Sequence, residues 1–508
     1  MSKPVSRRQF LAQTSCASVG SLGVLSSLLN LRMAGSAVGQ TLPPGEDYRA
    51  LVCLFFAGGM DSYNLLVPTT GSTVYNNYLN VRGGLYDAVN NADGLAIDGL
   101  PLTSHPTDPF GFGVHTKCGD HNSQPGIQSL YGSGQLAFVS NVGTLAERIT
   151  KTQYNNSTAK LPRGLYSHSD QVQQWHTSVT TAARSLGWAG SAADLLHAGN
   201  TGSKVSMNIS ISGNNIWQTG NKLFAYSIGT SGSNKLSDYN TPYETPVLPT
   251  STTNTRVALR TAAIDNMLQQ EYQNLLDQTF TQNLKDSVEA SAAFKDAFDD
   301  PLLSGINTPF PGDAAYVYPP GLTSSNDPAR TLGQQFKAIV KTIKIRQQLG
   351  LRRQTFFINY GSWDHHDEVI NTMDRMVDVV NRCLISYWQA LGEIGLQNNV
   401  TLYTASDFAR TLTSNGAGSD HAWGGNMFVL GGAVNGGRVY GSYPDVALTA
   451  PNVVTSRGST VPSLSVDEYF AELALWLGVT PGDLPSVLPR INTFYTPGGS
   501  PPVGFMQA

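Results

Sequence analysis

The apolar stretch that decides the fold is Ala50-Leu51-Val52-Cys53-Leu54-Phe55-Phe56, which ends abruptly at Gly58-Gly59. Every position is apolar, whereas a strand with one face in water would alternate apolar and polar residues. The stretch therefore predicts a strand that is buried on both faces, as strands are in a parallel sheet covered by helices.

The same pattern recurs along the chain, in alternation with helical spacing. Leu332, Phe336, Ile339 and Ile343 recur every three or four residues, which places them on one face of a helix. Further strands are expected at 136–139, 355–359 and 400–404, and further helices near 127–130 and 370–391. This alternation predicts an α/β fold, with a mostly parallel sheet and helices on both of its faces.

Composition divides the rest of the chain into segments. Residues 201–330 are rich in Ser, Thr, Asn, Gly and Pro around one helical island at 255–298, which indicates an irregular insertion or cap. The α/β domain would then consist of residues 48–200 and 331–496. The Pro- and Gly-rich end, residues 497–508, is typical of a flexible tail.

The first residues match an export signal. Ser6-Arg7-Arg8-Gln9-Phe10-Leu11 fits the twin-arginine signature, an uncharged stretch runs to Leu31, and small residues follow at 35–37. Residues 1–37 are therefore predicted to be a twin-arginine signal peptide, and the protein to be periplasmic or secreted. The alternative is a membrane anchor, because the uncharged stretch approaches spanning length. The glycines and polar residues in this stretch favour a signal that is removed over a permanent anchor. We expect no stable membrane span after the signal is removed.

Charge and cysteine content exclude several classes of function. The 508-residue chain has a net charge of -4 and only 13% charged residues, so it lacks the basic field that nucleic-acid binding requires. Cys53, Cys118 and Cys383 are far apart and odd in number, which argues against a disulfide framework. The oligomeric state is left open by the sequence.

Polar clusters follow the predicted strands, where ligands bind in open α/β sheets. Asp61 follows the first strand, and the sequence Asp364-His365-His366 follows the strand at 355–359. Asp407 and Arg410 follow the strand at 400–404, and Asp420-His421 comes shortly afterwards. Carboxylates and imidazoles are the natural ligands of zinc or manganese, whereas carboxylates without a cation would repel one another. A divalent metal is therefore expected, with Asp61, Asp364, His366, Asp407 and His421 as its ligands.

These residues also have simpler interpretations. Asp61 and Asp407 are residues of the type that caps helices, and His421 could be a buried structural histidine. His365 and His366 are adjacent, so only one of them is expected to face the site. Ser167 precedes a predicted helix that starts near Val172. It is either an ordinary N-cap or a hydroxyl placed where the helix N-terminus attracts an anion.

Taken in order, these segments resemble an exported family catalogued as domain of unknown function 1501, which is similar to the alkaline phosphatase and sulfatase superfamily. The resemblance is carried by the twin-arginine start and by motifs along the chain: Gly58-Gly59-x-Asp61-x-x-Asn64, Ser167-His168 with Trp175, Gly187-Trp188, Gly361-x-Trp363-Asp364-x-His366-Asp367, Ser406-Asp407-Phe408-x-Arg410-Thr411, Asp420-His421-x-Trp423-Gly424-Gly425, Val439-Tyr440-Gly441 and Val466-Asp467-x-Tyr469.

The resemblance implies roles for single residues. Asp61 would be a metal ligand after the first strand, Asp364 and His366 would serve one metal, Asp407 would take the place of a second Asp, and His421 would be the late histidine. Two features depart from the pattern. Most members carry Glu where Asp407 stands, and the nucleophilic Ser or Thr of alkaline phosphatases is not evident. Ser62 occupies a place usually held by Gly, so Ser167, which lies in a shared motif, is the preferred nucleophile.

The expected function is an exported, metal-dependent hydrolase of phosphate or sulfate esters. Ser167 or a water molecule would attack the ester, and Arg410 would pair with its anionic group through its planar fork of donors. The alternative is a non-catalytic envelope protein that keeps the fold and binds a polymer or a partner protein.

Overall fold

The computed structural model describes residues 48–507 apart from 70, 201, 204, 234–238, 240–250 and 271–274. The predicted twin-arginine signal, residues 1–37, lies outside the described residues. Among those that are described, no helix has both the length and the apolar character needed to cross a membrane.

The core of the molecule is a ten-stranded sheet in the order β12-β5-β11-β10-β1-β9-β6-β7-β8, with β15 pairing beside β5. Its strands are β1 Arg49–Phe56, β5 Leu136–Gly143, β6 Asn208–Ser210, β7 Tyr226–Gly229, β8 Gly232–Ser233, β9 Arg353–Asn359, β10 Val400–Ser406, β11 Gly425–Leu430, β12 Val439–Gly441 and β15 Leu464–Ser465. β8 and β11 run opposite to the other strands, so the sheet is mixed but mostly parallel. The expected α/β class is therefore confirmed.

β1 lies at the centre of this sheet and pairs in parallel with both β9 and β10. Every residue of β1 after Arg49 is buried, as its unbroken apolar sequence predicts. Its register places Phe56 beside Ser406 and Phe55 beside Asn359, so the three strands end together at one edge. The loops that leave these strands therefore emerge side by side.

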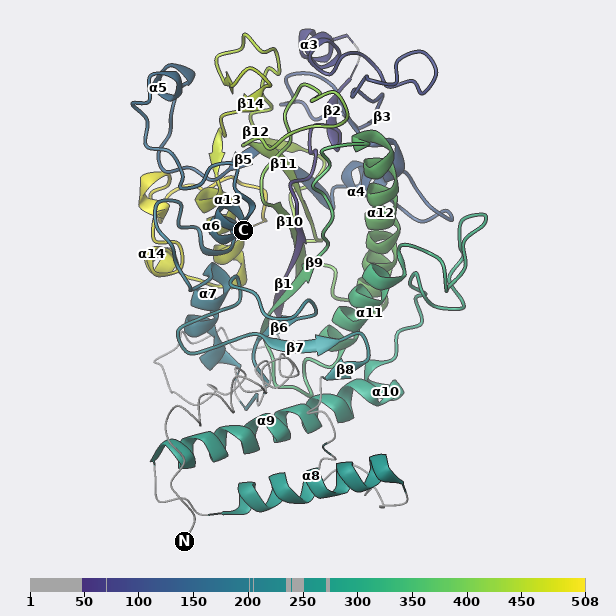
Figure 1. Ribbon diagram of the computed structural model, residues 1–508, viewed down its shortest axis with the longest axis vertical. Coiled ribbons are helices and arrows are strands. Elements are labelled where there is room, and N and C mark those ends of the chain that lie inside the picture. The colour runs from purple at the N-terminus through teal and green to yellow at the C-terminus, as the bar shows by residue number, and fades with distance from the viewer. Residues whose placement is uncertain are drawn as a thin grey trace.

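Helices cover both faces of the sheet (Figure 1). The helices are α3 Thr73–Val81, α4 Ile127–Gly132, α5 Lys151–Asn155, α6 His168–Thr177, α7 Trp188–Leu196, α8 Thr252–Gln269, α9 Leu275–Asp299, α10 Pro301–Ser304, α11 Arg330–Lys344, α12 Val369–Glu393, α13 Val466–Leu477 and α14 Leu484–Val487. In Figure 1, α11 and α12 lie on one side of the sheet, and α6, α7, α13 and α14 lie on the other. Small sheets beyond the main one are β2 Leu66–Pro68 with β4 Phe112–Val114 and β3 Leu100–Pro101, and β13 Val453–Val454 with β14 Ser459–Thr460.

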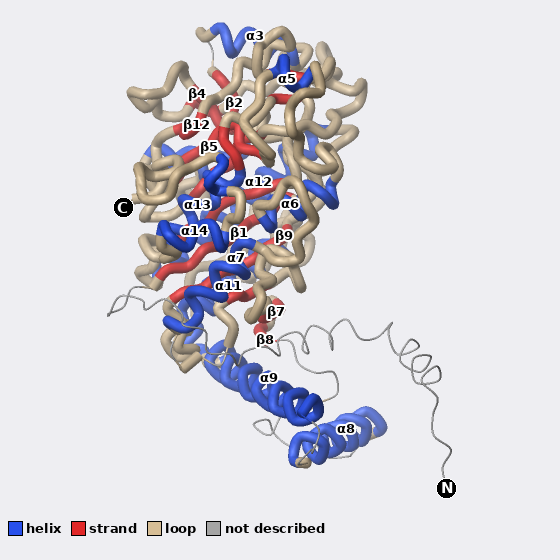
Figure 2. Tube along the Cα trace, turned by 90° about the vertical axis from the view of Figure 1, so that its left-hand side faces the viewer, coloured by secondary structure: helices blue, strands red, loops and turns tan. Residues whose placement is uncertain are grey.

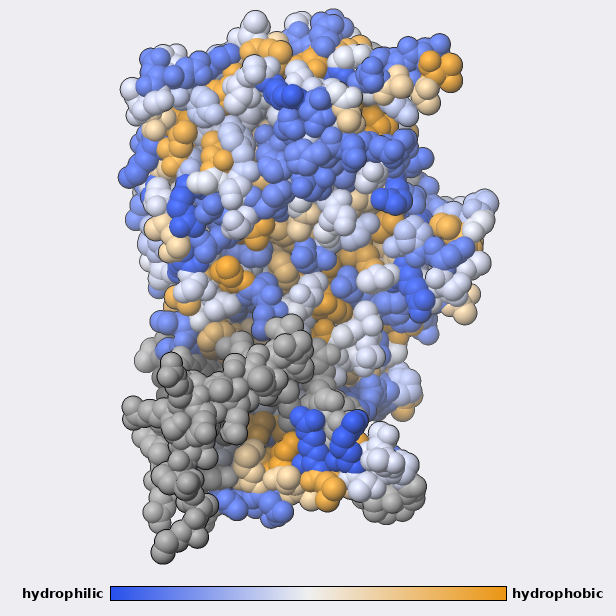
Figure 3. Space-filling view, in the orientation of Figure 1, coloured by the Kyte–Doolittle hydropathy of each residue, from blue (hydrophilic) through white to orange (hydrophobic). Residues whose placement is uncertain are grey.

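The segment expected to be an insertion, residues 201–330, is only partly separate from the sheet. β6 and β7 fall within it, yet both belong to the main sheet, because β6 pairs with β9. Helices α8 and α9 extend from the end of the molecule instead (Figure 2). Leu259 of α8 is 68% exposed, and Figure 3 shows hydrophobic surface at the lower end of the molecule, where Figure 1 places these helices.

The last described residues of the C-terminal tail, 503–507, are anchored to the rest of the protein. Phe505 is fully buried in the core. The carboxylate of Glu472 accepts hydrogen bonds from the backbone N–H groups of Val503, Gly504 and Met506. One apolar anchor and three satisfied amides thus hold a segment that composition alone would class as mobile.

Candidate metal centre

Loops from four strands meet at the carboxyl edge of the sheet. The loops after β1, β9 and β10 emerge there because these strands are parallel and end in register. β11 is antiparallel to β10 and starts at this same edge, so the residues just before it join the loops. The N-terminus of α6 supplies a fifth segment, which enters the site through His168.

Three imidazoles converge on one carboxylate. Nε2 of His366 and Nε2 of His421 lie 3.1 Å and 3.2 Å from Oδ1 of Asp364, and 3.1 Å from each other. Nε2 of His168 lies 3.5 Å from Oδ2 of Asp364. We call His168, Asp364, His366 and His421 the His/Asp cluster; ligand atoms of His168, Asp364 and His421 can all be chosen within 4.8 Å of one another.

Each imidazole is fixed through its other ring nitrogen. Nδ1 of His168 lies 2.7 Å from Oδ2 of Asp407, Nδ1 of His421 lies 2.8 Å from the carbonyl oxygen of Tyr166, and Nδ1 of His366 lies 3.3 Å from Oδ1 of Asp420.

A carbonyl oxygen only accepts, so Nδ1 of His421 carries the proton and Nε2 presents a lone pair to the cluster. Burial also lowers the pKa of His421, which favours the neutral ring. An oxygen acceptor behind each imidazole is the usual arrangement behind histidines that bind metals.

Asp364 remains ionised at any physiological pH. Burial alone would raise the pKa of this carboxyl group, but the hydrogen bond and charge of Arg410, together with His421, outweigh it and hold the pKa at about 2. The Asp364 side chain is 44% exposed, and those of His168, His366 and His421 are 37%, 47% and 22% exposed. The His/Asp cluster therefore combines permanent negative charge with access from solvent.

The structure gives Asp407 a different place from the expected one. Its side chain is only 3% exposed, and both of its oxygens are occupied. Oδ2 faces His168, and Oδ1 accepts the backbone N–H of Gly58 at 3.1 Å. Burial raises the pKa of Asp407, while the bonds from His168 and Gly58 oppose that rise. Asp407 orients the imidazole of His168 from behind and does not join the His/Asp cluster.

Arg410, expected to bind the anionic part of a substrate, instead forms hydrogen bonds within the protein. It is fully buried, and its Nε donates to the carbonyl of Gly59 at 2.7 Å, while Nη1 donates to that of Ser419 at 3.1 Å. Nη2 donates to the carbonyl of Gly58 at 2.6 Å and also to Asp364. Because every nitrogen of the guanidinium already has an acceptor, Arg410 holds three loops and Asp364 in place.

Asp61 also lies outside the His/Asp cluster. Its two oxygens accept bidentate hydrogen bonds from Arg82 at 2.6 Å and 3.0 Å, and both side chains are fully buried. A carboxylate engaged in this way by a guanidinium neutralises a buried cation, so Asp61 has a structural role here. The expectation that it faces the metal site is not met, because its partner Arg82, which directly follows α3, cannot be anticipated from the strand that precedes Asp61.

Gly58 occupies a position after β1 that requires glycine. Its φ of +118° lies in the region that favours glycine, and a Cβ atom at this position would sit 2.6 Å from the backbone nitrogen of Asp364. Without a side chain, the loop after β1 can pass against the loop after β9. This close approach brings the N–H of Gly58 to Asp407 and its carbonyl to Arg410.

His365 and His366 point in different directions, as expected for adjacent residues. His366 turns to the His/Asp cluster, whereas His365 is buried, lies 3.0 Å from the carbonyl of Ser362 through Nε2, and has its pKa lowered to about 4 by burial. Ser362 and Glu368, on either side of the loop, both have positive φ, at 74° and 45°. Such backbone conformations in residues other than glycine are concentrated at functional sites.

Ser167 is the N-cap residue of α6, but its hydroxyl does not cap the helix. Its Oγ lies 3.3 Å from Oγ of Ser169. The neighbouring residue His168 is the cluster member that sequence reasoning did not select. The signal was present, because His168 lies in the same motif as Ser167 and starts a helix, but nothing local shows that Asp407 stands behind its ring.

The described architecture is that of an α/β protein with an imidazole and carboxylate cluster at the carboxyl edge of a mostly parallel sheet. The family model for "Protein of unknown function (DUF1501)" matches residues 48–458, and the chain belongs to that family. No curated protein matches the chain.

Proposed function

We propose that this protein is an exported metal-dependent hydrolase of phosphate or sulfate esters. The observation that carries the proposal is the convergence of three Nε2 atoms on Asp364, each with its Nδ1 held by an oxygen. Three anchored imidazoles around an ionised carboxylate form a donor set that suits zinc or manganese.

The residues present fit such a cation. His168, His366, His421 and Asp364 would hold it, and Asp407 and Asp420 would orient two of the imidazoles from behind. Nε2 of His366 and Nε2 of His421 lie 3.1 Å apart. Without a cation between them, either their two lone pairs would face each other or one proton would have to be shared by both nitrogens. A bound divalent ion would polarise the ester oxygens and lower the pKa of an attacking water or hydroxyl.

The chain also supplies groups for the ester itself. The first turn of α6 begins at His168, so the amides and dipole of this helix point toward the cluster and favour an anionic oxygen there. Arg457 lies on the rim, 44% exposed and 3.1 Å from Asp420, and takes the anion-binding role first expected of Arg410. The nucleophile is the Ser167 hydroxyl or a water molecule.

Two wider expectations support this assignment and belong to the same proposal. The alkaline phosphatase-like fold agrees with a site at the carboxyl edge of a mostly parallel sheet. The sequence Ser6-Arg7-Arg8-Gln9-Phe10-Leu11 supports export by the twin-arginine route, which carries folded proteins and would place the enzyme in the periplasm or outside the cell.

The proposal is tested on the folded protein by elemental analysis and by turnover of p-nitrophenyl phosphate, bis-p-nitrophenyl phosphate and p-nitrophenyl sulfate. We expect zinc or manganese near stoichiometry, and turnover that is lost in His421→Ala and His366→Ala. His105→Ala is the matched control, since His105 contacts Thr107 outside the cluster. Ser167→Ala distinguishes the hydroxyl from water as the nucleophile. Absence of both metal and turnover overturns the proposal.

The non-catalytic alternative is favoured by two specific observations. The guanidinium of Arg410 donates its hydrogen bonds to backbone carbonyls and Asp364, so it does not face a substrate. The contact found for the Ser167 hydroxyl is with Ser169. A stoichiometric metal without turnover of any ester, in a protein that retains binding to a polymer or partner, would select this alternative.

A further inference from the structure

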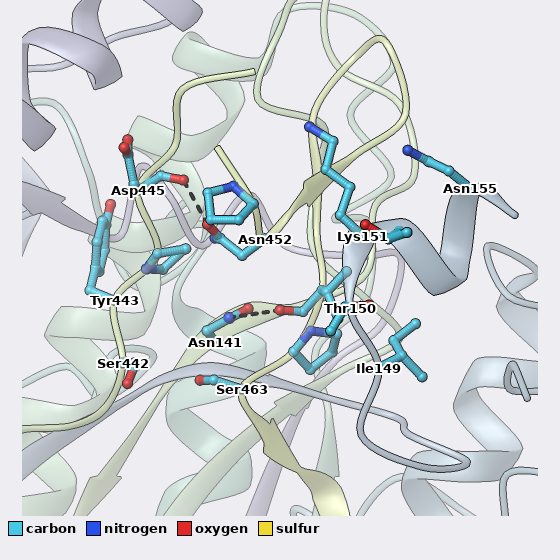
Figure 4. A pocket seen from close by; sticks show the side chains of 15 residues that line it. Asn141, Ile149, Thr150, Lys151, Asn155, Ser442, Tyr443, Asp445, Asn452 and Ser463 are labelled. Carbon is cyan, nitrogen blue, oxygen red and sulfur yellow. Dashed lines mark hydrogen bonds between the residues drawn. The ribbon is translucent and has the colours of Figure 1, made fainter. Parts of the chain in front are cut away.

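A cavity opens beside the His/Asp cluster, at the same edge of the sheet. It has a volume of about 760 Å³ and is bounded by β5, the loop after β12, α5 and the segment after β14. Figure 4 shows Asn141 and Asn452 toward its centre, with Tyr443 and Asp445 on one side and Lys151 on the other. The volume lies in the range of sites that hold small molecules or part of a polymer.

The lining is polar, and part of it has no partner within the protein. Oδ1 of Asn141 and Oγ of Ser463 are buried and without a hydrogen-bond partner among the described residues. Asn141 is itself 2% exposed, and its Nδ2 donates a hydrogen bond to the carbonyl oxygen of Val461. Its φ of 53° is unusual for a residue in a strand. A buried polar atom left unpaired is costly, so such atoms beside a cavity favour a bound polar molecule.

The two charged residues of the lining, Lys151 and Asp445, carry opposite charges and form hydrogen bonds within the protein. Lys151 donates to the carbonyls of Leu448 and Ala450 at 3.2 Å and 3.1 Å. Oδ1 of Asp445 accepts from Asn77 at 2.8 Å and from the N–H of Ala447 at 3.0 Å. With one positive and one negative group, the lining has no net charge, which favours a neutral ligand over an ionic one.

We propose that this cavity binds a segment of a neutral oligosaccharide. A pyranose ring presents hydroxyl groups around its rim and C–H groups on its faces. The amides of Asn141, Asn155 and Asn452 and the neighbouring Ser and Thr hydroxyls match the rim, since each can donate or accept. The rings of three prolines in the lining, Pro444, Pro451 and Pro462, give rigid apolar walls for the faces. A peptide would instead favour apolar holes for its side chains or an open strand edge.

The cavity and the His/Asp cluster are neighbours with separate walls. β5 and β10, whose carboxyl ends border the two sites, are separated only by β11, so they lie about 10 Å apart at the usual strand spacing. A small apolar cluster that includes Trp423 and Val461, with Tyr166 packed against it, stands between the sites. The saccharide site does not depend on catalysis, because none of the proposed metal ligands lines the cavity.

The test uses the folded chain and a panel of neutral hexasaccharides, namely cello-, xylo-, malto-, manno-, laminari- and chitohexaose, measured by calorimetry and saturation-transfer NMR. We expect at least one of them to bind. Asn452→Ala and Asn155→Trp should weaken that binding about tenfold or more, the first by removing hydrogen bonds and the second by filling the cavity. Asn156→Trp is the matched control, since Asn156 is also exposed and is absent from the lining.

Thermal unfolding of each variant verifies that it is folded. The proposal is overturned if no hexasaccharide binds to the wild-type chain, or if binding survives unchanged in both folded cavity variants. Binding of an unstructured Pro- and Ser-rich peptide at this cavity, in place of any saccharide, would also overturn it. Ester turnover and metal content are measured in parallel, so failure of the metal site and failure of the saccharide site give different results.

Discussion

Replacing Asp407 is the sharpest test of how the cluster is held. In the structure, Asp407 accepts one hydrogen bond from Nδ1 of His168 at 2.7 Å and one from the N–H of Gly58 at 3.1 Å. Asp407→Ala removes both acceptors in a buried place and frees the imidazole to rotate. Loss of a carboxylate behind a metal-binding histidine typically lowers metal affinity by about 10- to 100-fold, or about 1.4–2.7 kcal/mol. We expect a fall of that size.

Asp407→Asn should give an intermediate result. The amide oxygen still accepts the proton of His168, but the amide nitrogen then faces the N–H of Gly58, so one donor is left unpaired. Zinc affinity is measured by competition with a chromophoric chelator, and the stability of the metal-free protein by urea unfolding. Asp374→Asn is the matched control, because this aspartate lies 3.4 Å from the imidazole of His115, outside the cluster.

The reasoning is refuted if folded Asp407→Ala keeps the zinc affinity of the wild type. That result would mean that the orientation of His168 does not depend on Asp407, or that His168 does not bind the metal. An equal loss in Asp374→Asn would show that the effect is general destabilisation.

Three further predictions concern buried groups outside the cluster. Asp61→Asn should lower the free energy of unfolding in urea by about 3–5 kcal/mol, since it leaves the buried guanidinium of Arg82 without its charge partner; unchanged stability would contradict the assigned role. Deleting residues 503–507 should destabilise the fold measurably in a thermal melt, because Glu472 loses three backbone donors and the core loses Phe505, whereas a flexible tail would be removed without effect. Burial raises the pKa of Asp467 to about 7, above its unfolded value near 4, so its contribution to stability is fully present below about pH 4 and lost as the pH rises toward 7. Asp467→Asn should therefore be more stable than the wild type at pH 8, with the advantage shrinking at pH 5; urea midpoints that differ equally at both pH values would exclude this titration.

The secondary structure of the central domain followed from local patterns. Continuous apolar runs gave β1, β9 and β10, and the three- and four-residue spacing gave α11 and α12, each within a few residues of the observed ends. These patterns are reliable because burial on both faces of a strand, or on one face of a helix, constrains every side chain in the element. The short strands β6 and β7 lack such a pattern, so the sheet reached further into residues 201–330 than composition suggested.

The sequence predicted where the site lies but not the role of each residue in it. Strand order and the rule for sheet edges correctly placed Asp364, His366 and His421 together at the carboxyl edge. The same rule could not tell a cluster carboxylate from a supporting one, because Asp61 and Asp407 also follow strands that end at this edge. Their partners, Arg82 and His168, come from other parts of the chain.

The amino-acid sequence by itself determined the class of fold, the edge of the sheet where the chemistry gathers, and the kinds of side chain available there. Only the tertiary structure decided which role each one takes: Asp364 in the cluster, Asp407 behind His168, Asp61 on Arg82, and Arg410 inside the loops. The physical reason is that burial is a local pattern, whereas the role of a charged group is set by which hydrogen-bond partners reach it in space.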